Sequence, residues 1–294
     1  MFTRVALFAV LVVSLAVPVA QSKKSIIVTV LDQAGAPVKD VAAGDLAVVE
    51  DGNTRDVVEV KPATDPMTIA LVIDNTKPTM GKEAPTRELR AALTTFVRTV
   101  QAASPDSAIG LWEFAGAGVM TQKPTVKTED LTKKISRMFP SQQSGGVMLE
   151  ALVDASKELS KKETSPRRII VAISLNSPEV STIEPRDVAI AMRKAGVNFW
   201  SVSVSANQDA STSSGGSSAA RELIMSNVTA ASGGLRLTGV TAISLEAQVK
   251  RIADALTSQY IVTYARPDGA AATYTNIQAV SKKGMKALTT PWVQ

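Results

Sequence analysis

The sequence contains no cysteine and no histidine among its 294 residues. Without cysteine the protein cannot form disulfides, thiolate metal sites or an anchor on a lipidated cysteine. Without histidine it lacks the commonest general base and the commonest ligand of transition metals. Together these absences exclude the Ser-His and Cys-His machinery that many hydrolases use.

Aromatic residues are also scarce, at 4% of the chain, whereas 45% of the residues are hydrophobic and 20% are charged. This balance is typical of a globular protein with a substantial core, and that core must be built mostly from aliphatic side chains and alanine. The length allows one large domain, or one medium and one small domain.

The chain is basic, with a formal net charge of +5 at pH 7. Its basic residues are not concentrated in one patch, and no aromatic side chains are interleaved with them, so the pattern does not predict nucleic-acid binding. Solvated helix ends and loops account for the dispersed pairs, which are Lys23-Lys24, Lys133-Lys134, Lys161-Lys162, Arg167-Arg168 and Lys282-Lys283.

Residues 1–22 have the pattern of a secretory signal peptide. Arg4 precedes an apolar stretch over residues 5–17, and the small residues Ala20 and Ser22 offer cleavage positions. The alternative is an uncleaved anchor, but the stretch is short for a membrane span. No later segment is apolar enough to span a bilayer. We therefore expect a secreted or periplasmic protein without a membrane span after cleavage.

The rest of the chain changes pattern near residue 64. Residues 23–63 predict a small β-rich module with strands at 25–31, 46–50 and 57–60 and a hairpin turn at Asp51-Gly52-Asn53. Residues 64–266 alternate between strands and amphipathic helices, which predicts a doubly wound, mainly parallel α/β sheet flanked by helices. Residues 267–294 are expected to form a strand extension packed on that domain. A Ser/Gly-rich loop covers residues 207–218.

Asp74 follows a continuous apolar run at residues 67–73. A run of this kind predicts a central parallel strand, buried on both faces. Open α/β sheets place their ligand sites at the carboxyl ends of such strands. Asp74 is therefore the first candidate for a functional residue.

Several stretches resemble the von Willebrand factor A (VWA) domain, and more narrowly the secreted bacterial "VWFA-related" proteins known from Acidobacteria. Residues 69–76 resemble the first VWA strand and its metal loop. The β-rich preface, the Gly-Gly turn and the late strand of that group resemble residues 44–52, 231–235 and 258–264. The resemblance implies a Rossmann-like VWA fold and a role in protein binding.

A VWA domain usually holds Mg²⁺ in a metal-ion-dependent adhesion site with the pattern Asp-x-Ser-x-Ser, a later Thr and a later Asp. In this sequence Asp74 matches the first Asp and Thr76 keeps a hydroxyl, but Pro78 stands at the second Ser. The later Thr falls on Gly146 or Val147, beside Ser144. The final Asp is matched by Leu175, with Asn176 next to it.

The resemblance therefore implies a degenerate site with too few oxygen ligands for Mg²⁺ or Ca²⁺. We expect no cofactor, and Asp74 and Thr76 would be the ligands if a metal ion bound. Asp74 is instead expected to hydrogen-bond the surrounding turns and to pair with Lys77 or Arg87. The former metal site becomes a candidate binding face made of Asp74, Asn75, Thr76, Lys77, Pro78, Ser144, Gly146, Val147, Leu175 and Asn176.

The function that fits these observations is a secreted, non-enzymatic binding or scaffold protein with a protein partner in the envelope or outside the cell. The sequence identifies neither that partner nor the oligomeric state. Three alternatives stay open: a Mg²⁺- or Ca²⁺-dependent adhesion domain with a reduced site, a structural subunit of an envelope assembly, and an exported hydrolase. The hydrolase would use Asp/Lys chemistry, with Asp74 and Lys82 as its residues. Separately, Thr79 and Lys82 have the spacing of a hydroxyl nucleophile and its lysine base.

Overall fold

A computed structural model describes residues 21–77, 85–143, 145–161, 164–175, 177–204, 217–239, 241–267, 277–281 and 283–290. Residues 1–20 of the predicted signal peptide lie outside the described residues. So do Pro78, Thr79, Lys82, Ser144 and Asn176.

The larger domain contains a six-stranded sheet in which only one edge strand is antiparallel. In spatial order its strands are β10 (Arg236–Gly239), β9 (Val197–Val204), β8 (Arg167–Ser174), β5 (Met67–Ile73), β6 (Ala108–Glu113) and β7 (Val119–Thr125). All neighbours pair in parallel except β6 and β7. The chain enters at β5 and extends the sheet first to one side and then to the other. This is the doubly wound arrangement, as the sequence predicts.

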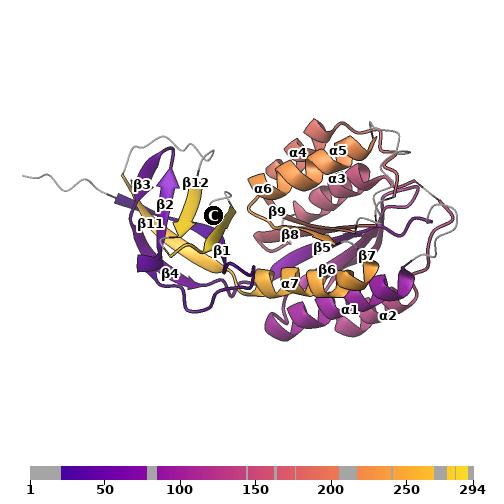
Figure 1. Cartoon of the computed structure of the whole chain (residues 1–294), viewed down its shortest axis with the longest axis horizontal. Helices are drawn as coiled ribbons and strands as arrows, with labels where there is room; N and C mark the ends of the chain where they lie inside the picture. The colour runs from indigo at the N-terminus through magenta and orange to yellow at the C-terminus, as the bar shows by residue number, and fades with distance from the viewer. Residues whose placement is uncertain are drawn as a thin grey trace, which may run out of the picture.

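Helices cover both faces of this sheet (Figure 1). One face carries α1 (Thr86–Ala103), α2 (Thr128–Ser136), the short η3 (Ala242–Ser244) and α7 (Leu245–Thr257). The other carries α3 (Met148–Leu159), α4 (Pro185–Lys194), α5 (Ser217–Leu223), the π-helical turn η2 (Ile224–Val228) and α6 (Thr229–Ala231). The π turn η2 separates α5 from α6 in one continuous helical segment. Within the described residues, no helix combines the length and the apolar character that a membrane crossing needs.

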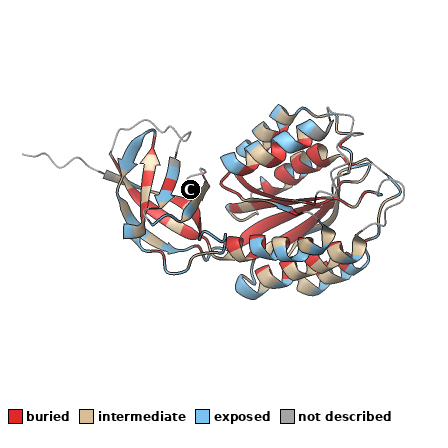
Figure 2. Cartoon of the chain, in the orientation of Figure 1, coloured by how far each residue is buried: buried red, intermediate tan, exposed pale blue. Residues whose placement is uncertain are grey.

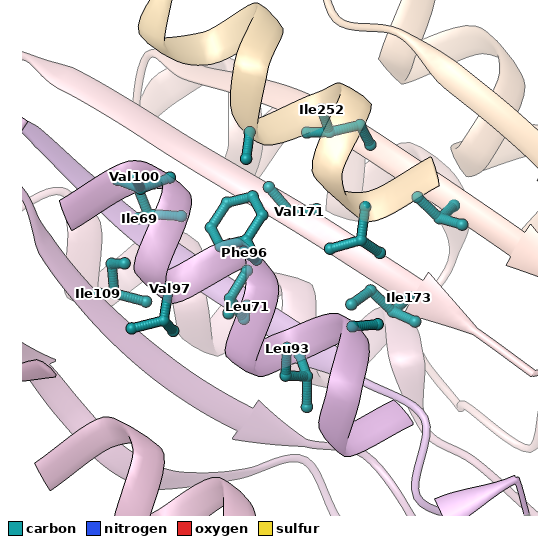
Figure 3. Close-up of a cluster of buried hydrophobic side chains, with 14 of the residues drawn as sticks. Ile69, Leu71, Leu93, Phe96, Val97, Val100, Ile109, Val171, Ile173 and Ile252 are labelled. Atoms are coloured by element: carbon teal, nitrogen blue, oxygen red, sulfur yellow. The ribbon is translucent and has the colours of Figure 1, made fainter. Parts of the chain in front are cut away.

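The core lies in two layers, one on each side of the sheet (Figure 2). All seven residues of β5 are buried, and successive side chains point to opposite faces. Ile69 and Leu71 pack toward Phe96 of α1 and Ile252 of α7 (Figure 3). Their neighbours Ala70 and Val72 belong to the second layer, with the side chains of α3 and α4. Trp112, Phe114, Phe199 and Trp200 are all fully buried and serve core packing.

The smaller β module is built from both ends of the described chain. One sheet has the order β13 (Lys286–Thr290), β1 (Gln21–Leu31), β11 (Tyr260–Pro267) and β4 (Val57–Pro62). The other contains β12 (Ile277–Ser281), β2 (Leu46–Glu50) and β3 (Asn53–Arg55), with the 3-10 turn η1 (Ala43–Asp45) before β2. All of these strands pair antiparallel. Asp51 and Gly52 have φ angles of 49° and 80°, so the predicted hairpin turn is present.

The pairing of the late strands does not match the domain boundary expected at residue 266. The sequence pattern places residues 260–266 in the α/β domain, but β11 pairs with β1 and β4 instead. The reason is its alternating pattern, because Tyr260, Val262 and Tyr264 point into the core of the β module. The segment after residue 266 was expected to pack on the α/β domain, but β12 pairs with β2. Strand β13 pairs with β1, so it also belongs to the β module.

Two linkers join the module to the α/β domain, and the buried side chain of Arg167 contacts both of them. Its Nη1 donates to the Ala63 carbonyl at 2.9 Å and to the Asp65 carbonyl in the linker before β5. Its Nη2 donates to the Leu256 carbonyl in the last turn of α7 at 3.2 Å and to Gln259 Oε1, in the linker after α7, at 2.9 Å. Burial lowers the pKa of Arg167 to about 10, so the side chain stays charged at neutral pH.

Inside the β module, the buried carboxylate of Glu50 joins strands of both sheets. It pairs with Arg55 Nε of β3 at 3.1 Å and with Arg266 Nε of β11 at 3.3 Å. Tyr264 also donates its hydroxyl to Glu50 Oε1 at 3.1 Å. Burial, then the hydrogen bond to Glu50 and the charge of that carboxylate, raise the pKa of Tyr264 to about 12.

This raised pKa predicts a loss of stability at high pH. Between the ordinary pKa of 10 and the folded-state value of about 12, the unfolded chain releases the phenol proton while the folded chain keeps it. The free energy of unfolding should therefore fall by about 2 kcal/mol across this window. Urea unfolding from pH 9 to pH 12 measures it, and the Tyr264→Phe variant should lack this component. Equal pH profiles for the two proteins would refute the assignment.

Candidate functional site

Asp74 lies at the carboxyl end of β5, where three loops meet. Its own backbone N–H donates to the Ile173 carbonyl of β8 at 2.9 Å. Backbone hydrogen bonds from N–H groups to carbonyls connect the three loops. Lys77 donates to Gln143 at 2.7 Å, Ser141 donates to Asn75 at 2.7 Å, and Gly146 donates to Pro178 at 2.8 Å. We call this surface the loop face; it comprises residues 74–77, 139–143, 145–147, 175 and 177–180.

The carboxylate of Asp74 is fully buried and accepts four hydrogen bonds. Oδ1 accepts from the Thr76 backbone N–H at 3.2 Å and from Thr76 Oγ1 at 2.7 Å. Oδ2 accepts from the Leu175 backbone N–H at 2.9 Å and from Ser177 Oγ at 2.8 Å. Two carboxylate oxygens offer about four lone-pair positions, so the hydrogen-bonding capacity of Asp74 is filled.

A guanidinium group approaches Asp74 from the other side of the site. Arg221, on α5, is buried, and its Nη1 lies 4.0 Å from Asp74 Oδ2. The same Nη1 donates to the Ser177 carbonyl at 2.7 Å and to Ser174 Oγ at 3.2 Å. The guanidinium carbon also lies 5.4 Å from the centre of the Phe114 ring, within range of a cation–π contact.

Glu179 supplies a second buried carboxylate. Its Oε2 pairs with Arg221 Nε at 2.7 Å, and its Oε1 accepts from the Met148 backbone N–H at 3.0 Å at the start of α3. Ser181 Oγ donates to the same Oε1. Glu179 is only 2% exposed, so this pair is shielded from water. Arg221 thus stands between two buried carboxylates, those of Asp74 and Glu179.

The structure places the described members of the predicted binding face as follows. Lys77 is exposed, and Asn75 donates its side-chain amide to Glu113. Gly146 is packed so closely that a Cβ would lie 2.8 Å from the Phe114 ring. Val147 donates its backbone N–H to Phe114 at 2.8 Å. Pro78, Ser144 and Asn176 belong to the same prediction but lie outside the described residues.

The expected ion pair of Asp74 with Lys77 or Arg87 is wrong. Arg87 pairs with its neighbour Glu88 at 3.0 Å, and Lys77 points to solvent. The reason is burial: a fully buried carboxylate needs a cation that also reaches the interior, and only the side chain from α5 does so among the described residues.

The groups around Asp74 do not fit Mg²⁺. This ion needs a near-octahedral set of oxygen ligands at about 2.0–2.1 Å. The oxygens of Asp74 and Thr76 are already engaged with each other, and the positive charge of Arg221 is close by. Within the part of the chain that the structure describes, no group of three or more acidic, histidine or cysteine side chains converges on a possible metal position.

Sequence reasoning did not identify Arg221 and Glu179. For Arg221 a local signal exists, because Ile224 and Met225 are three and four positions further on and are buried with it. Helical spacing therefore puts an arginine on an apolar face, which predicts a buried partner. Glu179 lies in a loop without periodicity and gives no such signal.

The comparisons with known proteins agree with this fold. The chain is similar to proximal thread matrix protein 1 from the mussel byssus, with 14% identity and a TM-score of 0.52 over 76% of this chain and 51% of that one. A second crystal form of that protein gives 15% identity and a TM-score of 0.50, over 67% and 50%. The SpRpn10 VWA domain is matched at 12% identity, with a TM-score of 0.46, over 63% of this chain and 95% of that one.

This chain spans about half the length of the mussel protein. No family model and no curated protein matches the sequence. At these identities a structural likeness defines the fold alone. Together with the strand order and the helices on both faces, it defines a doubly wound α/β fold beside an antiparallel β module.

Proposed function

We propose that this protein is a non-enzymatic, protein-binding domain that acts outside the cytoplasm and needs no metal ion. The observation that carries the proposal is the position of Arg221, whose guanidinium supplies the positive charge beside Asp74. In a metal-dependent adhesion site this charge comes from the cation. Here it comes from the protein, so the loop face is held in one shape without a ligand.

Exposed side chains on the loop face support a role in protein binding. The ring of Phe139 is 70% exposed and lies 4.7 Å from the guanidinium carbon of Arg90. Val180, on the neighbouring loop, is 54% exposed, and Lys77 is also exposed. Large apolar side chains on a rigid surface are typical of protein contact sites. The protein partner would contact this mixture of apolar and basic groups.

Titration calorimetry with Mg²⁺, Mn²⁺ and Ca²⁺ tests metal independence. We expect no binding heat at metal concentrations up to about 1 mM, since a site with so few free charged ligands binds divalent cations weakly. The Asp74→Asn variant serves as the matched control. Heat with the native protein that disappears in this variant would favour the alternative of a reduced adhesion site.

Crosslinking in the native envelope, followed by pull-down, tests the binding face. Phe139→Ser should weaken capture of a partner at least about tenfold, because an aromatic contact residue can contribute 2 kcal/mol or more. Ile243→Ser is the control, since Ile243 is 82% exposed on η3. If Val58→Ser on β4 abolishes capture while Phe139→Ser does not, the β module is the contact surface, as in an envelope assembly.

Among the described residues, nothing around Asp74 favours hydrolase chemistry. A general base needs a free lone pair within reach of the substrate, but both oxygens of Asp74 already accept hydrogen bonds from the protein. Lys82, the other half of the hydrolase hypothesis, lies outside the described residues. Turnover in a substrate screen that is lost in Asp74→Ala or Lys82→Ala would overturn the non-enzymatic proposal.

A further inference from the structure

A hollow of about 350 Å³ opens beside the loop face, at the carboxyl ends of β8, β9 and β10. Helix α5 forms one wall through Arg221 and Glu222, and strand β10 forms another through Arg236 and Thr238. Ser203 of β9 pairs in register with Thr238 and also lines the hollow. Because side chains alternate along a strand, Arg236 and Thr238 project to the same face of β10.

The polar lining is dominated by hydrogen-bond donors. Two guanidinium groups and the hydroxyls of Ser203 and Thr238 face a single carboxylate, that of Glu222. This carboxylate is held by the fork of Arg236, with Nη2 and Oε2 at 2.8 Å and a second contact through Nη1. The hydrogen bonds from Arg236 lower the pKa of Glu222, so this carboxyl is ionised at neutral pH.

Two of these donors have no acceptor. Nη2 of Arg221 and Nε of Arg236 are buried and make no hydrogen bond within the part of the chain that the structure describes. Arg221 is 6% exposed. Its Nη1 contacts Ser174 and Ser177, and both of these residues line the hollow. Glu179, the partner of its Nε, does not line the hollow. The terminal nitrogens of Arg221 therefore face the hollow, and buried donors of this kind favour an incoming acceptor.

The pair of Glu222 and Arg236 is poorly shielded from water. The side chain of Glu222 is 59% exposed and that of Arg236 is 25% exposed. An ion pair in such a setting contributes little, since water competes for both partners. Glu222 can therefore leave Arg236 at low cost, whereas Arg221 is fixed between Glu179 and Ser177.

We infer that this hollow binds a small oxyanion, a phosphate or a carboxylate group, with Arg236 as its main ligand-binding residue and Glu222 as an internal competitor. The oxyanion takes the place of the Glu222 carboxylate on the Arg236 fork, which suits planar or tetrahedral oxygen groups. Thr238 adds a hydroxyl donor, and Nη2 of Arg221 offers the remaining N–H groups. This inference does not depend on the protein-binding role of the loop face.

Isothermal titration of the full chain with inorganic phosphate, and separately with succinate, tests the inference at constant ionic strength in chloride. We expect a Kd of about 1 mM, because one bidentate charge-assisted contact carries most of the affinity. Glu222→Gln should tighten binding at least threefold by removing the competitor. Arg236→Gln should weaken it at least tenfold. The stronger of the two anions identifies the phosphate or carboxylate source.

The control is Arg186→Gln, which removes one positive charge from an exposed position on α4 and should leave the Kd unchanged. Thermal unfolding checks that each variant is folded. If Arg236→Gln does not fold, Thr238→Val replaces it as the site variant and should weaken anion binding severalfold. Two results would overturn the inference: no heat up to about 10 mM anion for either the native protein or Glu222→Gln, or equal losses in Arg236→Gln and Arg186→Gln. If Glu222 and Arg236 formed only a surface ion pair, Glu222→Gln and Arg236→Gln would have similar effects on anion binding. Opposite effects of these two variants on the Kd therefore distinguish a binding site from an ion pair.

Discussion

Replacing Arg221 with methionine should lower the free energy of unfolding by about 3–5 kcal/mol, since removing one partner of a buried ion pair leaves uncompensated charge in the interior. Methionine fills a similar volume but neutralises neither Asp74 nor Glu179, which are 0% and 2% exposed. The Ser177 carbonyl, which accepts from Nη1 at 2.7 Å, would lose this donor as well. Urea unfolding monitored by tryptophan fluorescence measures the difference.

A second substitution separates lost charge compensation from lost packing. Adding Glu179→Gln to Arg221→Met removes one of the two stranded carboxylates and should recover at least about 1 kcal/mol, because each buried unpaired charge costs several. Arg186→Met, at an exposed position on α4, should change stability by less than about 0.5 kcal/mol. A loss below about 1 kcal/mol for Arg221→Met would contradict the idea that its guanidinium takes the place of a cation.

Replacing Arg167 with methionine should both destabilise the protein and loosen the attachment of the β module. The guanidinium donates to the Ala63 carbonyl in the linker before β5 and to the Gln259 side chain in the linker after α7. Gln259 extends the contact to Thr29 of β1 at 3.0 Å. Several buried acceptors would lose their donor, at about 1–3 kcal/mol each, so a total loss of about 3–5 kcal/mol is expected. Burial of Arg167 and Gln259 makes rescue by water inefficient.

Hydrogen exchange distinguishes loosening of the module from a general loss of stability. In Arg167→Met, amide exchange at Ala63 and Gln259 should accelerate more than in the centre of β5, because the linkers open locally. Arg168→Met is the matched control, since Arg168 donates to the Ala195 carbonyl at 2.9 Å and contacts neither linker. It should cost about 1 kcal/mol and leave both linkers protected. Uniform acceleration across β5 and the linkers would exclude a local role in the attachment.

The architecture of the larger domain is carried by local patterns and could be predicted. A fully apolar run such as β5 can only be buried on both faces, and the amphipathic stripe of α1 matches its position over that strand. The strands of the β module were harder to place. Strand β11 has an ordinary strand pattern, but pairing with β1 rather than with the parallel sheet depends on contacts between distant parts of the chain.

Some features of the candidate site could likewise be predicted from the sequence, and others depend on the tertiary structure. The sequence by itself determined that Asp74 ends a buried strand, that no histidine or cysteine is present for catalysis or metal binding, and that Pro78 and Leu175 stand where metal ligands are expected. These follow from residue identity and short-range periodicity. Only the tertiary structure decided which cation faces Asp74. Arg221 and Glu179 come from separate elements, and only tertiary packing brings their side chains together with Asp74. Charges buried in this way need an opposite charge beside them.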